Sequence, residues 1–359
     1  MTRLLIAASG TGGHLFPALS VANSLPSAWE IVWLGVPDRM ETSIVPDYFK
    51  LFTIKVKGLQ TPGISRLFQL FSLFFSAFTV CKILRRERID IVFTTGGYIA
   101  APAIIGAICC RIPVVLHESN VLPGKVTRLL GRFCNLVAIG LSATKKYLPR
   151  SKTFVTGTPV RKEFYSEQEL SSWVPLGEGP LIVVMGGSQG AVGLNKMVRA
   201  VLPDLLKKGC RVVHLTGHNE CCENSFRHEN LIIKSFTDEV PSLLQHADLV
   251  ISRAGAGSIS ELAICASSVI LVPYPFAADK HQDLNALFLE ENGAALIVKQ
   301  DNLSVENLKK SIDYLLKTEG GFYTQCTKEN YQLRKSISKL AIRHSELNIV
   351  KILEKLVEN

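Results

Sequence analysis

Short runs of β-branched and aliphatic residues alternate along the chain with longer stretches of helical periodicity, and each short run ends in Gly, Pro or a polar turn. This alternation is typical of parallel sheets covered by helices. The strands expected in the first half are 3–8, 30–34, 89–94, 113–117, 136–139 and 153–155. Those of the second half are 181–185, 211–215, 231–234, 249–252, 269–272 and 295–298. The pattern therefore predicts an α/β protein with two similar, doubly wound, Rossmann-like domains.

The boundary between the two domains is expected at residues 157–161, where a strand ends in a Gly/Pro turn and the polar, strand-free segment 162–179 follows. We therefore assign residues 1–161 to the first domain and residues 162–359 to the second. From Asn302 onward the pattern is helical and highly charged. The sequence leaves open whether this last helical segment packs back on the first domain.

Length and composition exclude several classes of protein. A chain of 359 residues that is 47% hydrophobic and 20% charged can bury a sizeable core. No stretch reaches the roughly 20 apolar residues of a membrane-spanning helix, which excludes a polytopic membrane protein. The N-terminus lacks the pattern of a secretory signal, so we expect a cytoplasmic location. The nine cysteines have no regular spacing, which favours reduced thiols over a disulfide framework or a zinc site.

The positive charge is concentrated in the first half of the chain. Residues 1–160 contain 18 lysines and arginines against 7 acidic residues, whereas the remainder contains 22 against 24. This asymmetry indicates that one domain faces a polyanion, either nucleic acid or an anionic membrane surface, while the other binds a small ligand. A solvated basic face without a partner is the alternative.

Three of the expected strands lead into a Gly-rich turn that opens a helix, at residues 9–14, 186–190 and 253–258. Glycine lets the backbone approach an anion closely, and the amides and dipole of a helix N-terminus stabilise phosphate. Each turn alone is weak support, because such turns also occur for steric reasons. Three together predict a cleft lined by helix N-termini.

The Gly-rich turns do not match two common nucleotide-binding signatures. A dinucleotide fingerprint would begin at Gly10 and Gly12, but Leu15 stands at its third glycine position, and no acidic residue ends the second strand. None of the turns continues into the Lys-Ser/Thr pair of a P-loop. These departures favour nucleotide binding without a hydride cofactor or a P-loop.

Two further segments of the second half carry candidate chemistry. Glu261 stands at the start of the helix after the third turn, where a carboxylate can accept hydrogen bonds from two sugar hydroxyls. Its alternative role is to complement the helix dipole. Residues 273–286 form a long polar segment after a buried strand, and loops at the carboxyl ends of parallel strands bind ligands in open α/β sheets.

An apolar segment, residues 67–81, is rich in phenylalanine and is flanked by basic residues. It is too short to span a membrane, but an aromatic face beside cations suits the interface of an anionic bilayer. A buried core helix explains the apolar side equally well. The residues we assign to membrane docking are Leu67, Phe68, Phe71, Phe74, Phe75, Phe78, Lys82, Arg85 and Arg86.

Seven motifs together resemble the MurG family of bacterial transferases, which move N-acetylglucosamine to undecaprenyl-pyrophosphoryl-N-acetylmuramyl-pentapeptide, lipid I. They occur in the family's order and cover nearly the whole chain. The motifs are Ser9–His14 with Pro17-Ala18, Thr95–Tyr98, His117–Asn120, Pro159–Arg161, Gly186–Ala191, Ser252–Gly255 through Glu261, and His281-Gln282 with Asn285-Ala286.

The resemblance implies a GT-B fold with two domains facing across a cleft. The second domain would hold UDP-N-acetylglucosamine, and the first would dock on the cytoplasmic face of the inner membrane, as a peripheral protein, to receive lipid I. The product would be lipid II, the peptidoglycan precursor. The implied donor contacts are Thr11, Gly12, Gly13, Asn120, Arg161, Ser188, Thr237, Ala256, Gly257, Ser258, Ile259, Ser260, Glu261 and Gln282.

The implied reaction is displacement with inversion at the anomeric carbon, which needs a general base and a stabilised leaving group. His14 is the candidate base, because imidazole titrates near neutral pH. His14 could instead bind the acceptor or cap the turn, and Glu118 is the second candidate, either as base or as the group that orients His14. We expect no cofactor and no essential metal ion, because no pair of carboxylates stands at a strand end.

Two positions depart from the family pattern. Ser9 stands where the family commonly has glycine, and Thr158 stands where it commonly has asparagine. Neither position touches the chemistry that the resemblance implies.

Other functions are compatible with parts of this sequence pattern. The nearest are a GT-B transferase with another UDP-sugar or acceptor, and a UDP-sugar epimerase of related architecture. A nucleic-acid-binding protein is disfavoured, because the basic residues lack interleaved aromatic residues. A membrane scaffold would be expected to lack His14 or Glu261, and both are present.

Overall fold

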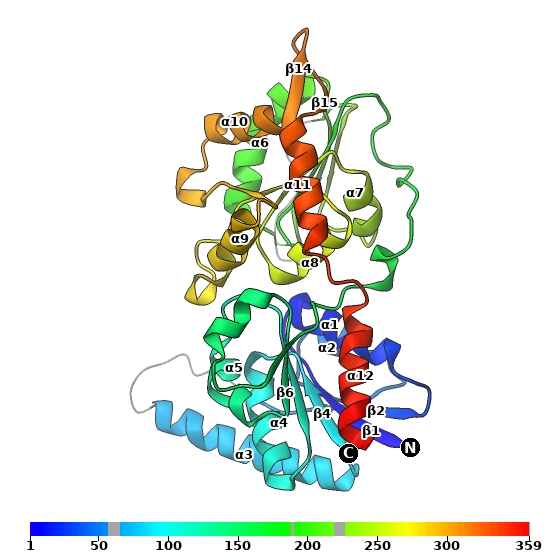
Figure 1. Cartoon of the computed structure of the whole chain (residues 1–359), viewed down its shortest axis with the longest axis vertical. Helices are drawn as coiled ribbons and strands as arrows, with labels where there is room; N and C mark the ends of the chain where they lie inside the picture. Colours follow the sequence, from blue (N-terminus) through cyan, green and yellow to red (C-terminus); the bar gives the residue numbers. More distant parts are fainter. Residues whose placement is uncertain (57–64, 188–189, 219–226, 359) are drawn as a thin grey trace. The chain divides into compact units, whose positions relative to one another are not determined.

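The computed structural model describes residues 1–56, 65–187, 190–218 and 227–358. The chain forms two compact units. Unit 1 consists of Met1–Arg161 together with His344–Asn359, and unit 2 consists of Lys162–Arg343. Each unit has a parallel sheet with helices packed on it (Figure 1).

The sheet of unit 1 has seven strands in the order β3-β2-β1-β4-β5-β6-β7, and every pair is parallel. The order changes direction between β1 and β4, and ligands of such sheets bind at the carboxyl ends beside this switch point. The prediction of a doubly wound parallel sheet is confirmed. The strands are β1 (Thr2–Ala7), β2 (Trp29–Gly35), β3 (Lys50–Thr53), β4 (Ile91–Thr94), β5 (Val114–Glu118), β6 (Leu136–Ile139) and β7 (Thr153–Val155).

Helices cover both faces of this sheet and bury two apolar clusters. One cluster lies between the sheet and helices α3 and α4. The other contains α1 and the last helix, α12, which pack on one another. The helices are α1 (Gly12–Ser24), α2 (Glu41–Ile44), α3 (Ser65–Arg86), α4 (Gly97–Cys110), α5 (Lys125–Leu130) and α12 (Ser345–Glu358), with 3₁₀ turns η1 (Gly131–Phe133) and η2 (Ser142–Tyr147).

The sheet of unit 2 has six parallel strands in the order β10-β9-β8-β11-β12-β13. Its switch point lies between β8 and β11, the strands that precede the second and third Gly-rich turns. The second doubly wound sheet of the prediction is therefore confirmed. The strands are β8 (Leu181–Met185), β9 (Arg211–Leu215), β10 (Leu231–Lys234), β11 (Leu249–Ser252), β12 (Val269–Leu271) and β13 (Leu296–Ile297).

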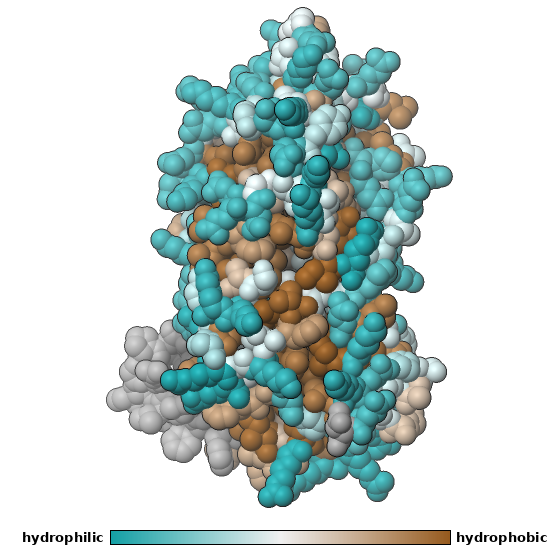
Figure 2. Space-filling model, viewed as in Figure 1, coloured by the Kyte–Doolittle hydropathy of each residue, from teal (hydrophilic) through white to brown (hydrophobic). Residues whose placement is uncertain are grey.

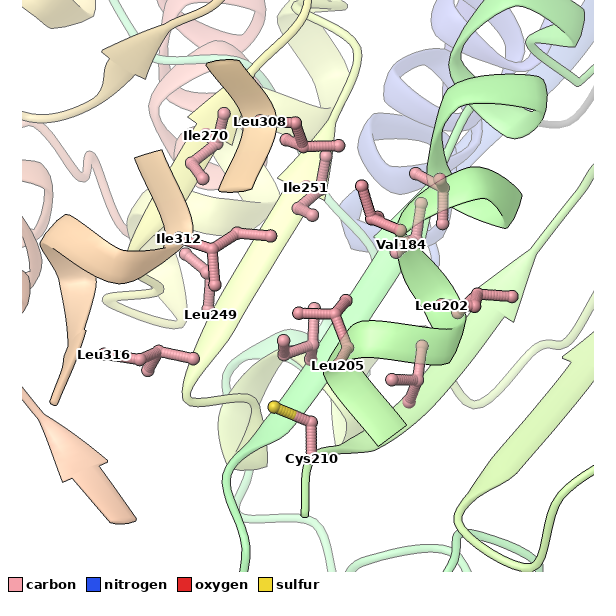
Figure 3. Packing of buried hydrophobic residues seen from close by; sticks show 14 of the residues in the cluster. Val184, Leu202, Leu205, Cys210, Leu249, Ile251, Ile270, Leu308, Ile312 and Leu316 are labelled. Carbon is pink, nitrogen blue, oxygen red and sulfur yellow. The ribbon is translucent and has the colours of Figure 1, made fainter. Parts of the chain in front are cut away.

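The main core of unit 2 packs helices α6 and α10 against the sheet. Leu202 and Leu205 of α6, with Leu308 and Ile312 of α10, lie against strand residues such as Ile251 (Figure 3). The helices of this unit are α6 (Val192–Lys207), α7 (Val240–His246), α8 (Ala256–Ile264), α9 (His281–Glu291), α10 (Val305–Leu315) and α11 (Lys328–Lys339). The 3₁₀ turns are η3 (Lys162–Phe164), η4 (Ala278–Lys280) and η5 (Gln300–Asn302).

One prediction for this region is wrong, because the chain beyond Asn302 is not helical throughout. Strands β14 (Leu316–Glu319) and β15 (Phe322–Cys326) form an antiparallel hairpin. The connecting residues Gly320 and Gly321 both have positive φ, 58° and 88°. A Gly-Gly pair is the characteristic two-residue turn of such hairpins, so the sequence did contain the signal.

Candidate functional site

The first Gly-rich turn joins β1 to α1 at the switch point of unit 1. Thr11 immediately precedes α1, and its carbonyl accepts hydrogen bonds from the amides of His14 and Leu15. A Cβ at Gly12 would lie 2.7 Å from the Phe16 ring, so a side chain there would require that ring to shift. Gly13 is exposed in the first turn of α1.

His14 is half-buried and reaches the neighbouring turn, which joins β4 to α4. Its Nδ1 lies 2.7 Å from the Thr95 carbonyl oxygen. A carbonyl only accepts hydrogen bonds, so Nδ1 carries the proton and Nε2 of the neutral ring has a free lone pair. A Cβ at Gly97 would lie 3.7 Å from Nε2, which places this nitrogen over the first turn of α4.

Glu118 ends β5 and is buried, and its carboxylate accepts hydrogen bonds from the loop that follows it and from helix α5. Its Oε1 accepts from the backbone amide and the side-chain amide of Asn120, at 3.1 and 3.2 Å. Its Oε2 accepts from the Gly124 amide and the Thr127 hydroxyl, both at 2.9 Å. To act as a base, Glu118 would have to give up part of this set. Its geometry instead suits a residue that positions Asn120.

His117, beside Glu118, is fully buried, and its Nε2 donates to the Gly157 carbonyl at 3.1 Å. Burial, the largest cause, lowers the pKa of His117 to about 4, so the ring is neutral at physiological pH. The bond ties the end of β5 to the turn that precedes Arg161. Sequence reasoning gave His117 no role, because its burial and its partner follow from the sheet order.

Glu41 is a second residue that sequence reasoning missed. It is completely buried, and its carboxylate accepts from the Val36 amide at 2.7 Å and from the Gly10 amide at 3.3 Å. The sequence has no acidic residue at the end of the second strand, but α2 places the Glu41 carboxylate beside that strand end. The Gly10 amide of the first turn therefore already has an anionic partner within the protein.

The third turn, in unit 2, opens α8. Gly255 precedes the helix, and Ala256, Gly257 and Ser258 supply amides of its first turn, which have no partner four residues earlier in the helix. The Ile259 side chain is buried in the core, and the Ser260 hydroxyl donates to the Ala256 carbonyl at 3.1 Å. Glu261 is half-buried in the same helix.

The second turn is shaped by glycines that tolerate no side chain. A Cβ at Gly186 would lie 2.5 Å from that of Ala191, and one at Gly190 would lie 2.6 Å from the Thr216 carbonyl oxygen. Ser188, the predicted donor contact of this turn, lies outside the described residues.

The remaining predicted donor contacts lie on three other segments. The buried Thr237 hydroxyl accepts a hydrogen bond from the Glu239 amide at 3.2 Å, so this side chain is bonded to the backbone of its own loop. Gln282, in the first turn of α9, accepts through Oε1 from the Tyr274 amide at 3.0 Å. Arg161 is half-buried at the end of unit 1. Within each unit, the predicted residues thus gather at the carboxyl ends of the strands.

The two departures from the family pattern are both buried. In the described part of the chain the Thr158 hydroxyl has no hydrogen-bond partner. Ser9 stands at the start of the first turn and contributes no side-chain contact to the geometry above.

No group of three or more metal-ligating side chains occurs within the described ranges. A groove of about 600 Å³ lies in unit 2 between α9 and α10, lined by residues that include Leu284, Leu287, Ile297 and Lys310. None of the predicted donor residues lines it. The predicted donor residues that the structure describes therefore lie in or after the turns at the strand ends and not in this groove.

Known proteins match the chain over its whole length. Residues 4–139 match the glycosyltransferase family 28 N-terminal domain, and residues 181–341 match the C-terminal domain of that family. A transferase of Prochlorococcus marinus (strain MIT 9303) is 54% identical over 357 residues, covering 99% of both chains. One of Synechococcus sp. (strain CC9902) is 55% identical over 357 residues, covering 99% of this chain and 100% of its own.

Both relatives bear the name UDP-N-acetylglucosamine–N-acetylmuramyl-(pentapeptide) pyrophosphoryl-undecaprenol N-acetylglucosamine transferase. The crystal structure of Acinetobacter baumannii MurG superimposes with a TM-score of 0.76 at 26% identity, covering 99% of this chain and 100% of that one. The chain belongs to the MurG family. Its two parallel-sheet units are the two domains of the GT-B fold, as the motifs predicted, and membership of the MurG family makes the chain a glycosyltransferase.

Proposed function

We propose that the protein transfers N-acetylglucosamine from UDP-N-acetylglucosamine to the 4-hydroxyl of N-acetylmuramic acid in lipid I, giving lipid II. Peptidoglycan synthesis, and with it cell shape and division, would depend on this product. The observation that carries the proposal is the 54% identity over 99% of the chain to a relative of that name. The arrangement of the turns at the two switch points is consistent with it.

In this proposal, unit 2 holds the donor. The first-turn amides of α8 stabilise the diphosphate, and Ser188 and Arg161 assist. Glu261 binds sugar hydroxyls, and Gln282 lies beside the loop that follows β12. Asn120 and the first turn, Thr11 to Gly13, complete the donor contacts.

His14 is the general base of this proposal. Nε2 takes the proton of the acceptor 4-hydroxyl while the oxygen of that hydroxyl bonds to the anomeric carbon of the donor. The bond between the anomeric carbon and the UDP oxygen breaks, and its electron pair stays on UDP. The α-linked donor thereby becomes a β-linked sugar. The Thr95 carbonyl fixes the tautomer that leaves Nε2 free to accept. Glu118 acts as a positioning residue through Asn120.

A donor comparison tests this assignment against the alternatives. The protein should consume UDP-N-acetylglucosamine in the presence of a lipid I analogue at least tenfold faster than UDP-glucose or UDP-N-acetylgalactosamine. Formation of a UDP-linked epimer without acceptor would instead indicate an epimerase. Preference for another donor would indicate a different GT-B transferase.

We also propose that unit 1 docks on the anionic cytoplasmic face of the inner membrane. On α3, Phe75 and Phe78 are 66% and 55% exposed, and the Lys82 ammonium lies 4.6 Å from the centre of the Phe78 ring. The cations Arg85 and Arg86 are exposed on the same helix. The side chains of Leu67, Phe68, Phe71 and Phe74 lie outside the described residues.

Exposed apolar side chains also occur on α4, which packs on α3, and on α5 and η1. Ile108 of α4, Leu129 of α5 and Phe133 of η1 are exposed, and the Arg132 guanidinium lies 4.6 Å from the centre of the Phe133 ring. On the visible face of unit 1, Figure 2 shows hydrophobic side chains with hydrophilic ones beside them. Within the described ranges no helix meets the length and hydropathy needed to cross a bilayer. Apolar rings beside cations favour adsorption to an interface.

Charge reversal tests the docking surface. Each cation near an anionic surface contributes about 1 kcal/mol, so Arg85→Glu with Arg86→Glu should weaken binding to vesicles containing anionic lipid by tenfold or more. UDP affinity should not change. Lys335→Glu with Lys339→Glu, exposed on α11 of unit 2, makes the same change in net charge and serves as control. Equal loss in both double variants would contradict a local docking surface.

A further inference from the structure

Arg253 opens the third Gly-rich turn and is buried, with 6% of its surface exposed. Its Nη1 donates to the carbonyl oxygens of Val272 and Pro273, at 3.1 and 3.2 Å. Its Nη2 donates to Oε1 of Gln300 at 2.7 Å. One side chain therefore ties the turn before α8 to the end of β12 and to η5.

These partners reach the other segments of the predicted donor site. A Cβ at Gly193, near the start of α6, would lie 3.0 Å from the Gln300 amide nitrogen, so Gln300 packs against the helix that follows the second turn. The Arg253 guanidinium lies 5.5 Å from the centre of the Tyr274 ring, and the Tyr274 amide donates to Gln282. Arg253 thus joins the starts of α6, α8 and α9.

The charge of Arg253 has no anionic counterpart in the described part of unit 2. Among the residues that the structure describes, no carboxylate forms an ion pair with it, and its Nε has no hydrogen-bond partner. Burial lowers the pKa of Arg253, but a guanidinium remains protonated in proteins. A buried charge without a counter-charge is costly, and a bound anion nearby offsets that cost.

We propose that Arg253 is a positioning residue of the donor site whose uncompensated charge, acting through the third turn, makes unit 2 prefer a nucleoside diphosphate to the uncharged nucleoside. This inference rests on the proposed function of unit 2 as the donor-binding unit. It gives a role to an arginine that is not among the predicted donor contacts.

Competition binding of UDP and of uridine to the full-length protein tests this role. Arg253→Met should weaken UDP binding tenfold or more and change uridine binding by less than twofold. Arg253→Lys keeps the charge and should retain the wild-type ratio of UDP to uridine affinity. Gln300→Leu removes a hydrogen-bond partner without changing the charge, and it should leave the ratio unchanged.

Parallel losses of UDP and uridine affinity in Arg253→Met would overturn the proposal, because they would show a packing role only. If the methionine variant does not fold, Arg253→Gln replaces it. If neither neutral variant folds, the test rests on Arg253→Lys, which keeps the charge. A ratio of UDP to uridine affinity that is tenfold lower in this variant than in the wild type would show that the charge does not set the preference. A wild-type protein that fails to bind UDP would instead overturn the proposed function itself.

Discussion

The hydrogen bond between His14 and the Thr95 carbonyl decides which ring nitrogen of His14 can accept a proton. Because Thr95 fixes Nδ1 as the donor, the chemistry rests on Nε2. Replacing His14 by alanine should lower kcat by about 10²- to 10⁴-fold, the range of general-base catalysis. Steady-state transfer rates and calorimetric UDP binding check this, and UDP affinity should stay within twofold. A wild-type kcat in His14→Ala would assign the base elsewhere.

His117 gives the stability of unit 1 a pH dependence. Its pKa is about 4 in the folded protein against 6.5 in the unfolded chain, so the unfolded chain takes up the proton first as the pH falls. The contribution of the neutral His117 ring to the free energy of unfolding is complete above pH 6.5. As the pH falls from 6.5 to 4, the free energy of unfolding decreases by about 3 kcal/mol. Urea unfolding across this range should show a shallower loss for His117→Gln. An identical slope in the variant would contradict the assignment.

At the scale of elements, two glycines of the second turn are needed for different reasons: one for its backbone conformation alone, the other also because a side chain would clash. Gly187 and Gly190 both have positive φ, 88° and 86°, but only a Cβ at Gly190 meets a backbone atom, the Thr216 carbonyl oxygen at 2.6 Å. Gly187→Ala should therefore cost about 1 kcal/mol of stability from its backbone conformation alone. Gly190→Ala should cost at least about 2 kcal/mol and should weaken UDP binding more strongly.

Thermal unfolding measures the stability loss of the two alanine variants, and titration with UDP measures their affinity. Equal stability losses would mean that the Thr216 carbonyl moves away at little cost. The turn would then be less rigid than its geometry indicates.

The strands of both sheets were predictable because buried parallel strands appear as continuous apolar runs, and their ends mark the Gly-rich turns. Strand β3, an edge strand with the sequence Lys-Leu-Phe-Thr, was missed, since it is short and partly exposed. The hairpin β14–β15 was missed because the charged residues around Gly320-Gly321 resemble a helical surface. In both cases the local pattern is weak and the tertiary context decides.

The candidate site was predictable as a set of positions but not as a set of interactions. The first Gly-rich turn shows that His14 follows β1, whereas its partner Thr95 comes 81 residues later. The bonds of Glu118 require the loop after β5 to fold back, and the bond from Glu41 to Gly10 requires α2 to return to the sheet. Such long-range contacts depend on strand order, which no local pattern specifies.

At the scale of the whole molecule, the chain leaves unit 1 after Arg161 and returns to it with α12. Ile349, Val350 and Leu353 of α12 are buried in the cluster that contains α1. Leu353→Ala should therefore destabilise unit 1 by about 2 to 5 kcal/mol through the lost apolar contact and the cavity left behind.

Chemical denaturation followed by a unit 1 fluorophore, such as Trp33, can measure this loss. The UDP affinity of the folded variant should remain that of the wild type, because Leu353 lies in the apolar cluster of unit 1 and is not a predicted donor contact. A stability change below about 1 kcal/mol would show that α12 contributes little to the core of unit 1.

The proposed function requires that this chain join the sugar of UDP-N-acetylglucosamine to lipid I. The most direct measurement is transfer of labelled N-acetylglucosamine to a short-chain lipid I analogue, with His14→Ala and Glu261→Ala assayed beside the wild type. We expect a labelled disaccharide lipid from the wild type and a collapse of transfer in both variants. Release of UDP by the wild type without sugar transfer, or indifference to the lipid I analogue, would contradict it.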